Sequence, residues 1–211
     1  GEMSEAALLK NSDIAMGLKS FKLIFTRDAY TQMLVQSFTG RPSEIVCDPT
    51  LLVSKEVFSM PCQLPKQKYL LVYSYGVDDL LQQRIKAYAK ARGLSVISAF
   101  FWHYWCDRTV SCSAFEFSYL VENAECVFTS TFHGAIITML NHKKCCIYPV
   151  RNKVADVVRR FGVGEKLIGA TTSQERFDTI MNSEFPSDDF EEKLKAARSR
   201  SMELLKGVLM C

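Results

Sequence analysis

Residues 126–137 read CVFTSTFHGAII, and between two apolar runs they hold a histidine, a glycine and three hydroxyl side chains, Thr129, Ser130 and Thr131. A simple connector needs only Gly, Asn or Asp to turn. Hydroxyls can donate to an anion, and the imidazole of His133 can donate to one or carry a proton. Gly134 would let the backbone come close to the same ligand. The segment is therefore a candidate site for a phosphate or a carboxylate.

The same residues also have a structural interpretation. Ser130 and Thr131 are typical helix N-caps, which would make His133 an ordinary surface histidine. Arg27 is a second residue suited to an anion, because a guanidinium makes paired contacts to a carboxylate or a phosphate. Its structural alternative is an ion pair with Asp28 or a solvated side chain.

From residue 68 onward, apolar strand-like runs alternate with amphipathic helical segments. The strands are expected at 68–75, 94–100, 126–129 and 144–150, and the helices at 79–92, 113–123, 134–141, 154–161, 173–182 and 188–206. This alternation is typical of βαβ units and predicts an α/β fold with a doubly wound, Rossmann-like parallel sheet. Residues 68–170 should supply at least four parallel strands with helices on both faces. The first strand is followed by SYGVDD rather than GxGxxG, so the dinucleotide fingerprint is absent.

The first part of the chain follows another pattern. Helices are expected at 3–19 and 28–38, the second closed by Gly40, with short strands at 21–25 and 43–52. These elements cannot bury much surface alone. We therefore predict a partial N-terminal segment at 1–52 (the tail of an N-terminal domain or a packed extension), a linker at 53–67, a Rossmann-like domain at 68–185, and a C-terminal helix at 186–211. Within this last segment, the helix at 188–206 is expected to be closed by Gly207.

Ligands of doubly wound sheets bind outside the carboxyl ends of the strands, where several of these residues are expected. Ser130 and Thr131 follow one strand there, and Tyr75 ends another. The loop Phe101–Trp105 follows a third strand. Its side chains Trp102, His103, Tyr104 and Trp105 are expected to be exposed and could stack on a sugar or pack against another domain. Asp48 is interpreted as a turn cap, and Asp78 with Asp79 as a helix N-cap or, alternatively, an acid near the cleft.

Composition narrows the class of protein. The chain has 211 residues, 48% of them hydrophobic and 23% charged, which is ordinary for a globular protein. A net charge of +3 without a basic run argues against a nucleic-acid partner. No apolar stretch approaches the roughly 20 residues of a membrane span, and the charged first twenty residues are unlike a signal peptide. A cytoplasmic location is the prediction.

Eight cysteines raise the question of disulfides or zinc. A chain of this length does not need disulfide staples. His103, Cys106 and Cys112 lack a second paired-ligand motif that would complete a zinc site. We predict reduced cysteines, no bound metal and no cofactor.

Three ordered motifs resemble one family. In residues 24–53 an Arg-Asp pair opens a helix and Asp-Pro-Thr-Leu-Leu follows a strand; residues 115–150 contain Thr-x-x-Phe-His-Gly between a strand and a helix; and residues 152–169 read NKVADVVRRFGVGEKLIG. Over residues 20–170 the chain resembles the polysaccharide pyruvyl transferases. Several members carry a basic residue two positions before the histidine, where this chain has Thr131.

The resemblance implies a two-domain, GT-B-like architecture of which this chain is the C-terminal portion. It also implies a transferase that moves pyruvate from phosphoenolpyruvate onto two hydroxyls of a sugar, forming a ketal and releasing phosphate. His133 would then be catalytic, and Arg27, Ser130, Thr131, Gly134, Tyr75 and Trp102 would bind substrate. The implied partners are phosphoenolpyruvate, a sugar or polysaccharide-precursor acceptor, and membrane-bound lipid-linked sugars contacted peripherally. Two other functions stay open: a GT-B-like glycosyltransferase using a nucleotide sugar, and a non-catalytic module of the same fold.

Overall fold

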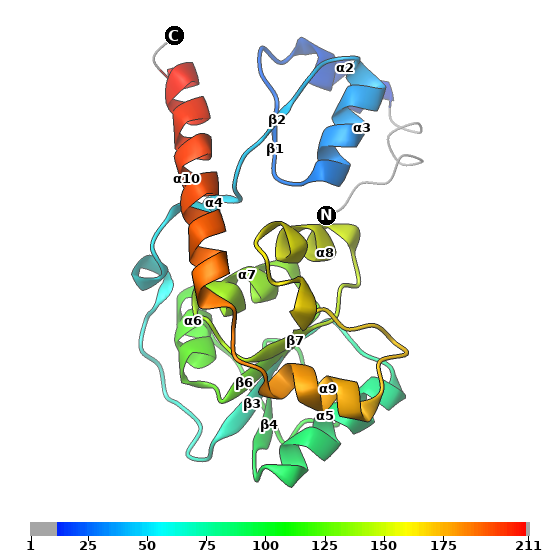
Figure 1. Ribbon diagram of the computed structural model, residues 1–211, viewed down its shortest axis with the longest axis vertical. Coiled ribbons are helices and arrows are strands. Elements are labelled where there is room, and N and C mark those ends of the chain that lie inside the picture. Colours follow the sequence, from blue (N-terminus) through cyan, green and yellow to red (C-terminus); the bar gives the residue numbers. More distant parts are fainter. Residues whose placement is uncertain (1–11, 210–211) are drawn as a thin grey trace.

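The computed structural model describes residues 12–209, so part of the helix predicted at 3–19 lies outside the described residues. Five parallel strands form the main sheet in the order β5-β4-β3-β6-β7 (Figure 1). Their bounds are β3 Tyr69–Tyr73, β4 Ser95–Ala99, β5 Arg108–Val110, β6 Cys126–Thr129 and β7 Cys145–Ile147. The predicted α/β fold with a doubly wound parallel sheet is confirmed.

The central strands are buried on both faces, which explains their unbroken apolar sequences. Along β3, Tyr69 and Leu71 belong to one hydrophobic cluster, and Leu70 and Val72 belong to the other. The first cluster is closed by α6 Ala114–Asn123, α7 Phe132–Leu140, α8 Asn152–Arg160 and α10 Ser187–Leu209. The second is closed by α5 Asp79–Ala91 and α9 Gln174–Asn182. The sheet is thus covered by helices on both sides.

Side-chain caps determine where most of these helices begin. Asp78 caps α5, as expected, by accepting from the amide of Leu81, and Ser113 forms a capping box with Glu116 at the start of α6. Ser173 caps α9. Each cap satisfies amides that have no acceptor within the helix.

A smaller unit precedes the main sheet. It contains α2 Ser12–Ser20, β1 Phe25–Thr26, α3 Ala29–Thr39, β2 Glu44–Ile45 and α4 Pro49–Leu52, followed by the 3-10 turn Lys55–Phe58. The strands β1 and β2 pair in parallel as a separate two-stranded sheet. Gly40 ends α3 at a φ of 67°, as predicted, which favours glycine.

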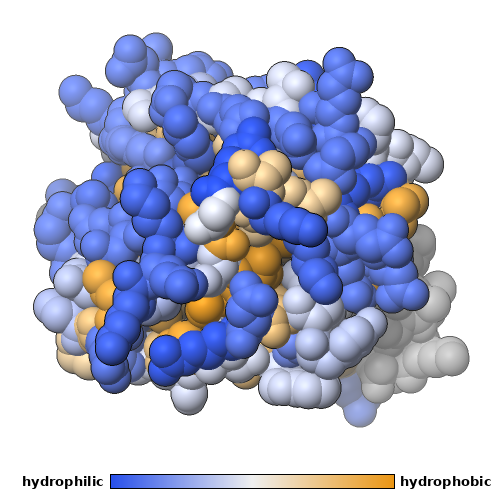
Figure 2. All heavy atoms as spheres, turned by 90° about the horizontal axis from the view of Figure 1, so that it is seen from below, coloured by the Kyte–Doolittle hydropathy of each residue, from blue (hydrophilic) through white to orange (hydrophobic). Residues whose placement is uncertain are grey.

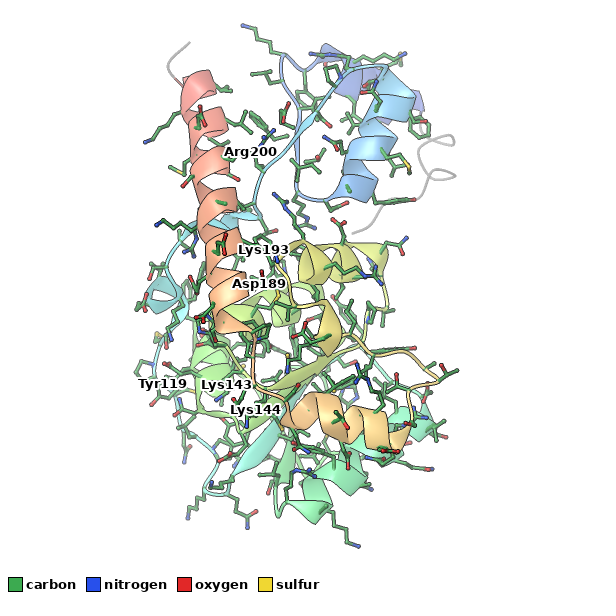
Figure 3. The ribbon with its side chains drawn as sticks, in the orientation of Figure 1. Tyr119, Lys143, Lys144, Asp189, Lys193 and Arg200 are labelled. Atoms are coloured by element: carbon green, nitrogen blue, oxygen red, sulfur yellow. The ribbon has the colours of Figure 1, made fainter. Side chains whose placement is uncertain are left out.

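The long helix α10 runs from the main sheet to this smaller unit (Figure 1). Arg200, labelled in Figure 3, extends from α10 toward β2, where its Nη2 lies 2.9 Å from Oε2 of Glu44. The buried hydroxyl of Ser201 accepts from the amide of Cys47 at 2.9 Å. These contacts join α10 to the smaller unit. The division into tail, linker, Rossmann-like domain and C-terminal helix stays a prediction.

Several element boundaries differ from the sequence predictions. The strand expected at 21–25 comprises only Phe25–Thr26, and α7 starts two residues earlier than expected, at Phe132. The strand β5 was not predicted; it follows the aromatic loop and pairs with β4 at the edge of the sheet. Gly207 does not end α10, which continues to Leu209, because one glycine costs a helix only about 1 kcal/mol.

The surface at the end away from β1 and β2 is mainly hydrophilic, with apolar side chains visible in a central hollow (Figure 2). Such a mixture is ordinary, because folded proteins leave much apolar surface exposed. Within residues 12–209, no helix combines the length and apolar character needed to cross a membrane.

Candidate active site

A pocket of about 220 Å³ lies at the carboxyl ends of β3 and β6 and contains most of the predicted site residues. Its walls are Arg27, Tyr73, Tyr75, Ser130, Thr131, Phe132, His133, Val150, Arg151, Lys153 and Val154. The predicted position of Ser130–Gly134 at the carboxyl edge of the sheet is confirmed. The structure therefore brings Arg27, Tyr75, Ser130, Thr131 and His133 together, although Arg27 lies more than a hundred residues from His133 in the sequence.

The hydroxyls at the carboxyl end of β6, on Thr129, Ser130 and Thr131, are buried and hydrogen-bonded to one another or to residues at the end of β3. Thr129 Oγ1 donates to the carbonyl of Tyr73 at 2.8 Å, and the hydroxyl oxygens of Ser130 and Ser74 lie 2.7 Å apart. Thr131 Oγ1 accepts from the amide of Gly134 at 3.0 Å, so Thr131 is the N-cap of α7. The capping interpretation thus applies to Thr131, while Ser130 joins the ends of two neighbouring strands.

Gly134 lies behind the pocket rather than on its wall. It is buried, and its amide is already bound to Thr131. A Cβ at this position would come closer than 3.0 Å to the hydroxyl oxygens of Thr129 and Thr131 and to the ring of Tyr73. Close packing therefore requires glycine here.

Arg27 is held between a carboxylate and an aromatic ring. Its Nη1 lies 2.8 Å from Oδ2 of Asp48, and its guanidinium carbon lies 4.6 Å from the ring centre of Phe132. The alternative ion pair with Asp28 is not formed; Asp28 instead caps α3 by accepting from the amide of Thr31 at 2.7 Å. Arg27 keeps 36% of its side chain exposed, so it can still reach a ligand.

Asp48 also faces His133, whose Nε2 lies 4.0 Å from Oδ1 of Asp48. Asp48 caps α4, as predicted, by accepting from the amide of Thr50 at 3.1 Å. Burial raises the pKa of Asp48, but hydrogen bonds from Thr50 and Arg27 and the charge of His133 outweigh this effect and hold the pKa below its ordinary value. The cap is therefore also a carboxylate shared by two pocket residues, a role that its position in the sequence does not reveal.

Sequence reasoning missed two cationic residues of the pocket, Arg151 and Lys153. Both lie at the start of α8, just after β7, and Lys153 Nζ lies 5.4 Å from the ring centre of Phe132. Because β7 is the neighbour of β6, the segment VRNK at 150–153 must reach the same edge of the sheet. The position of this segment directly after a strand of the same sheet was the signal that could have identified Arg151 and Lys153.

The aromatic loop lies beside the pocket. Tyr75 is exposed and lines the pocket, and its ring centre lies 5.0 Å from that of Phe101. Trp102 and Tyr104 are exposed, with ring centres 6.5 Å apart, but neither belongs to the pocket wall. The prediction that Trp105 is exposed was wrong: it is only 7% exposed and belongs to the cluster beneath α5.

The seven described cysteines form no disulfide. Among residues 12–209, no group of three or more His, Cys, Asp or Glu side chains is arranged to hold a metal ion. Reduced thiols and the absence of zinc stay predictions for experiment.

Comparison with known sequences decides the family. Residues 12–152 match the family model described as polysaccharide pyruvyl transferase, which is more than half of the chain. The chain belongs to the polysaccharide pyruvyl transferase family. The resemblance drawn from the three motifs is thereby confirmed. No curated protein matches this family member.

Solved structures with a similar fold include UDP-GlcNAc 2-epimerases. The enzyme from Neisseria meningitidis bound to UDP-GlcNAc shares 12% identity over 97% of this chain and 67% of its own, with a TM-score of 0.55. The epimerase from Methanocaldococcus jannaschii shares 10% identity over 85% of this chain and 61% of its own, with a TM-score of 0.50. At these identities the likeness shows a GT-B-type α/β fold, and this pyruvyl transferase family member spans only about three fifths of the M. jannaschii chain.

Proposed function

We propose that this protein transfers pyruvate from phosphoenolpyruvate to two hydroxyls of a sugar, as a ketal, in polysaccharide biosynthesis. Family membership supports a transferase. The single observation that carries the donor assignment is the pocket at the carboxyl edge, which Arg27, Arg151 and Lys153 line together with His133. Three cationic side chains lining one small space fit a ligand that carries a phosphate and a carboxylate.

The size of the pocket favours a small donor. Its volume of about 220 Å³ lies below the roughly 300–1,000 Å³ of sites that enclose drug-sized ligands. A nucleotide sugar adds a base, a ribose and a hexose to its phosphates and would need additional space. Phosphoenolpyruvate has only a three-carbon skeleton and a phosphate.

The proposed reaction has balanced proton transfers. His133 gives a proton to the methylene carbon of phosphoenolpyruvate, which becomes the methyl group, while a sugar oxygen bonds to the neighbouring carbon. The second sugar oxygen then displaces phosphate from that carbon. One hydroxyl proton of the sugar restores His133, and the other leaves with the phosphate. Arg27, Arg151 and Lys153 neutralise the phosphate as it departs.

The acceptor would lie on the aromatic side of the pocket. Tyr75 reaches from the pocket wall toward the aromatic loop, and Trp102, 75% exposed, offers a face on which a sugar ring can stack. Ser130 and Thr131 complete the floor near the donor. We assign the acceptor to sugars or polysaccharide precursors, including lipid-linked sugars met at a membrane surface, and the protein to the cytoplasm.

Calorimetric titration of the chain with phosphoenolpyruvate, and separately with UDP-GlcNAc, tests the donor. We expect phosphoenolpyruvate to bind, with an affinity that falls as salt is added, because part of the attraction is electrostatic. Inorganic phosphate should compete. Binding of UDP-GlcNAc without binding of phosphoenolpyruvate would replace this proposal by a nucleotide-sugar function, and binding of neither would favour a non-catalytic module.

A further inference from the structure

One buried carboxylate connects two segments of the fold at the pocket. Oδ2 of Asp48 contacts Nη1 of Arg27, from the loop after β1, at 2.8 Å. Oδ1 of the same group faces Nε2 of His133, from the first turn of α7, at 4.0 Å. Arg27 and His133 therefore meet across one side chain that is only 5% exposed.

We propose that Asp48 is a positioning residue that holds Arg27 and His133 over the pocket in the arrangement a ligand needs. This inference rests on the proposed function insofar as the ligand is phosphoenolpyruvate. Asp48 is absent from the pocket wall, so it acts through its two neighbours rather than on the substrate.

The arginine has the most to gain from such a partner. A free arginine side chain loses rotamer entropy when it binds an anion, and this loss weakens binding. Here Asp48 holds one nitrogen of the guanidinium while the ring of Phe132 lies beside its carbon at 4.6 Å. The entropy is thus lost on folding, and the remaining N–H groups of Arg27 stay available to a ligand.

Asp48 can position others because its own surroundings are fixed. It caps α4, and Leu51, three residues later in the same helix, is buried in the core. Arg198 of α10 donates to the carbonyls of Leu51 and Val53, at 2.5 and 2.8 Å. The carboxylate thus lies at the start of a short helix that is fixed by the burial of Leu51 and by the hydrogen bonds from Arg198. A group that supports a binding site needs such fixed surroundings.

Removing the charge of Asp48 should change the affinity for an anion in opposite directions under a positioning role and under a purely electrostatic role. A carboxylate beside an anion site repels the anion, so an electrostatic role alone predicts tighter binding once its charge is removed. A positioning role predicts weaker binding, because Arg27 becomes mobile and Arg27 and His133 lose their common partner. Asp48→Asn tests this cleanly, because asparagine has nearly the same shape and caps helices as well as aspartate does.

Asp28→Asn is a matched control. Asp28 is also buried, also caps a helix in the smaller unit, and accepts at 2.7 Å from both the amide and the hydroxyl of Thr31. It has no place in the pocket wall. Both variants therefore exchange a buried capping carboxylate for a neutral cap, and only one of them faces Arg27 and His133.

The measurements are the affinity for phosphoenolpyruvate by calorimetry and the Nε–H signal of Arg27 by NMR. We expect Asp48→Asn to bind about tenfold more weakly, the loss of one well-placed charged contact, and its Arg27 signal to move to the position of a mobile arginine. Asp28→Asn should match the wild type in both. If the wild type binds and Asp48→Asn binds equally or more tightly, the inference is wrong. If the wild type binds no phosphoenolpyruvate, the proposed function fails instead, and an unchanged Arg27 signal in Asp48→Asn would still refute positioning.

Discussion

The amide of Gly134 donates to Oγ1 of Thr131 at 3.0 Å, and the packing around this bond leaves no room for a side chain on the glycine. Alanine is normally the better residue inside a helix. Here its methyl group would collide with Thr129, Thr131 and Tyr73. We predict that Gly134→Ala lowers the free energy of unfolding by about 1–3 kcal/mol, the range for overpacking a core.

Urea denaturation of Gly134→Ala and Gly164→Ala provides the comparison. A Cβ on Gly164 would meet its nearest atom, on Arg159, at an ordinary 3.6 Å, and the φ of Gly164 is not in the left-handed region. Its substitution should therefore change stability little. Equal losses in the two variants would show that the hydroxyl packing under α7 is looser than described.

Lys166 is fully buried and lies where α9 ends. Its Nζ donates to the carbonyls of Ser183 and Glu184, both at 2.8 Å, and burial lowers its pKa. Lys166→Met would remove these partly buried hydrogen bonds from a charged donor. We predict a loss of about 1–3 kcal/mol in the free energy of unfolding.

Lys144, labelled in Figure 3, serves as the control for this substitution. It pairs with Glu184 at 2.6 Å but keeps 38% of its side chain exposed. Such exposed pairs contribute at most about 1 kcal/mol. Thermal or urea unfolding in which Lys144→Met costs as much as Lys166→Met would contradict the role assigned to the buried amine.

The main sheet, and the carboxyl edge at which the site residues lie, could be predicted from the sequence, because both depend on local patterns. Apolar runs such as YLLVY and CVFT identify buried parallel strands, and parallel strands bring their carboxyl ends to one edge. The position of Ser130–His133 follows from these two rules. The short edge strand Arg108–Val110 escaped prediction because three residues beside an aromatic loop form no clear period.

The Arg27–Asp48–His133 contact could not be predicted, because it depends on how the smaller unit packs against the main sheet. Asp48 has the sequence of a turn cap and is one, and only the tertiary structure shows that it also faces Arg27 and His133. Trp105 shows the same limitation in reverse: its neighbours Trp102 and Tyr104 are exposed, whereas tertiary packing buries Trp105 itself.

The pKa of Asp48 predicts how stability depends on pH. Because its pKa in the folded protein is below the ordinary 3.8, the native state favours the charged carboxylate. Its contribution should be complete above pH 3.8 and should disappear as the pH falls through the lowered value. The difference in unfolding free energy between wild type and Asp48→Asn should therefore shrink in acid. Denaturant titrations over a series of pH values measure it, and a difference that grows in acid would contradict this sign.

The buried thiols should react slowly in the native protein. Burial raises the pKa of Cys126 and of Cys145 to about 12, and only the thiolate attacks a disulfide reagent. We expect Ellman's reagent at pH 8 to label these two residues only after unfolding. Under denaturing, non-reducing conditions nearly all eight cysteines of the chain should react. A large deficit of free thiols, or stoichiometric zinc in a metal assay, would refute the prediction of reduced, metal-free cysteines.

The role of His133 in the pocket is the central claim, and calorimetry with phosphoenolpyruvate tests it most directly. His133 keeps 57% of its side chain exposed, so His133→Ala should leave thermal stability nearly unchanged. It should weaken binding by about 1.5–3 kcal/mol, the usual scale of a hydrogen bond to a charged group. His142→Asn is the control, since His142 pairs with Glu191 of α10 and has no place in the pocket wall. The predicted result is weaker binding by His133→Ala, but not by His142→Asn, at an unchanged melting temperature. A His133→Ala variant with a lower melting temperature that still binds phosphoenolpyruvate as tightly as the wild type would contradict the account.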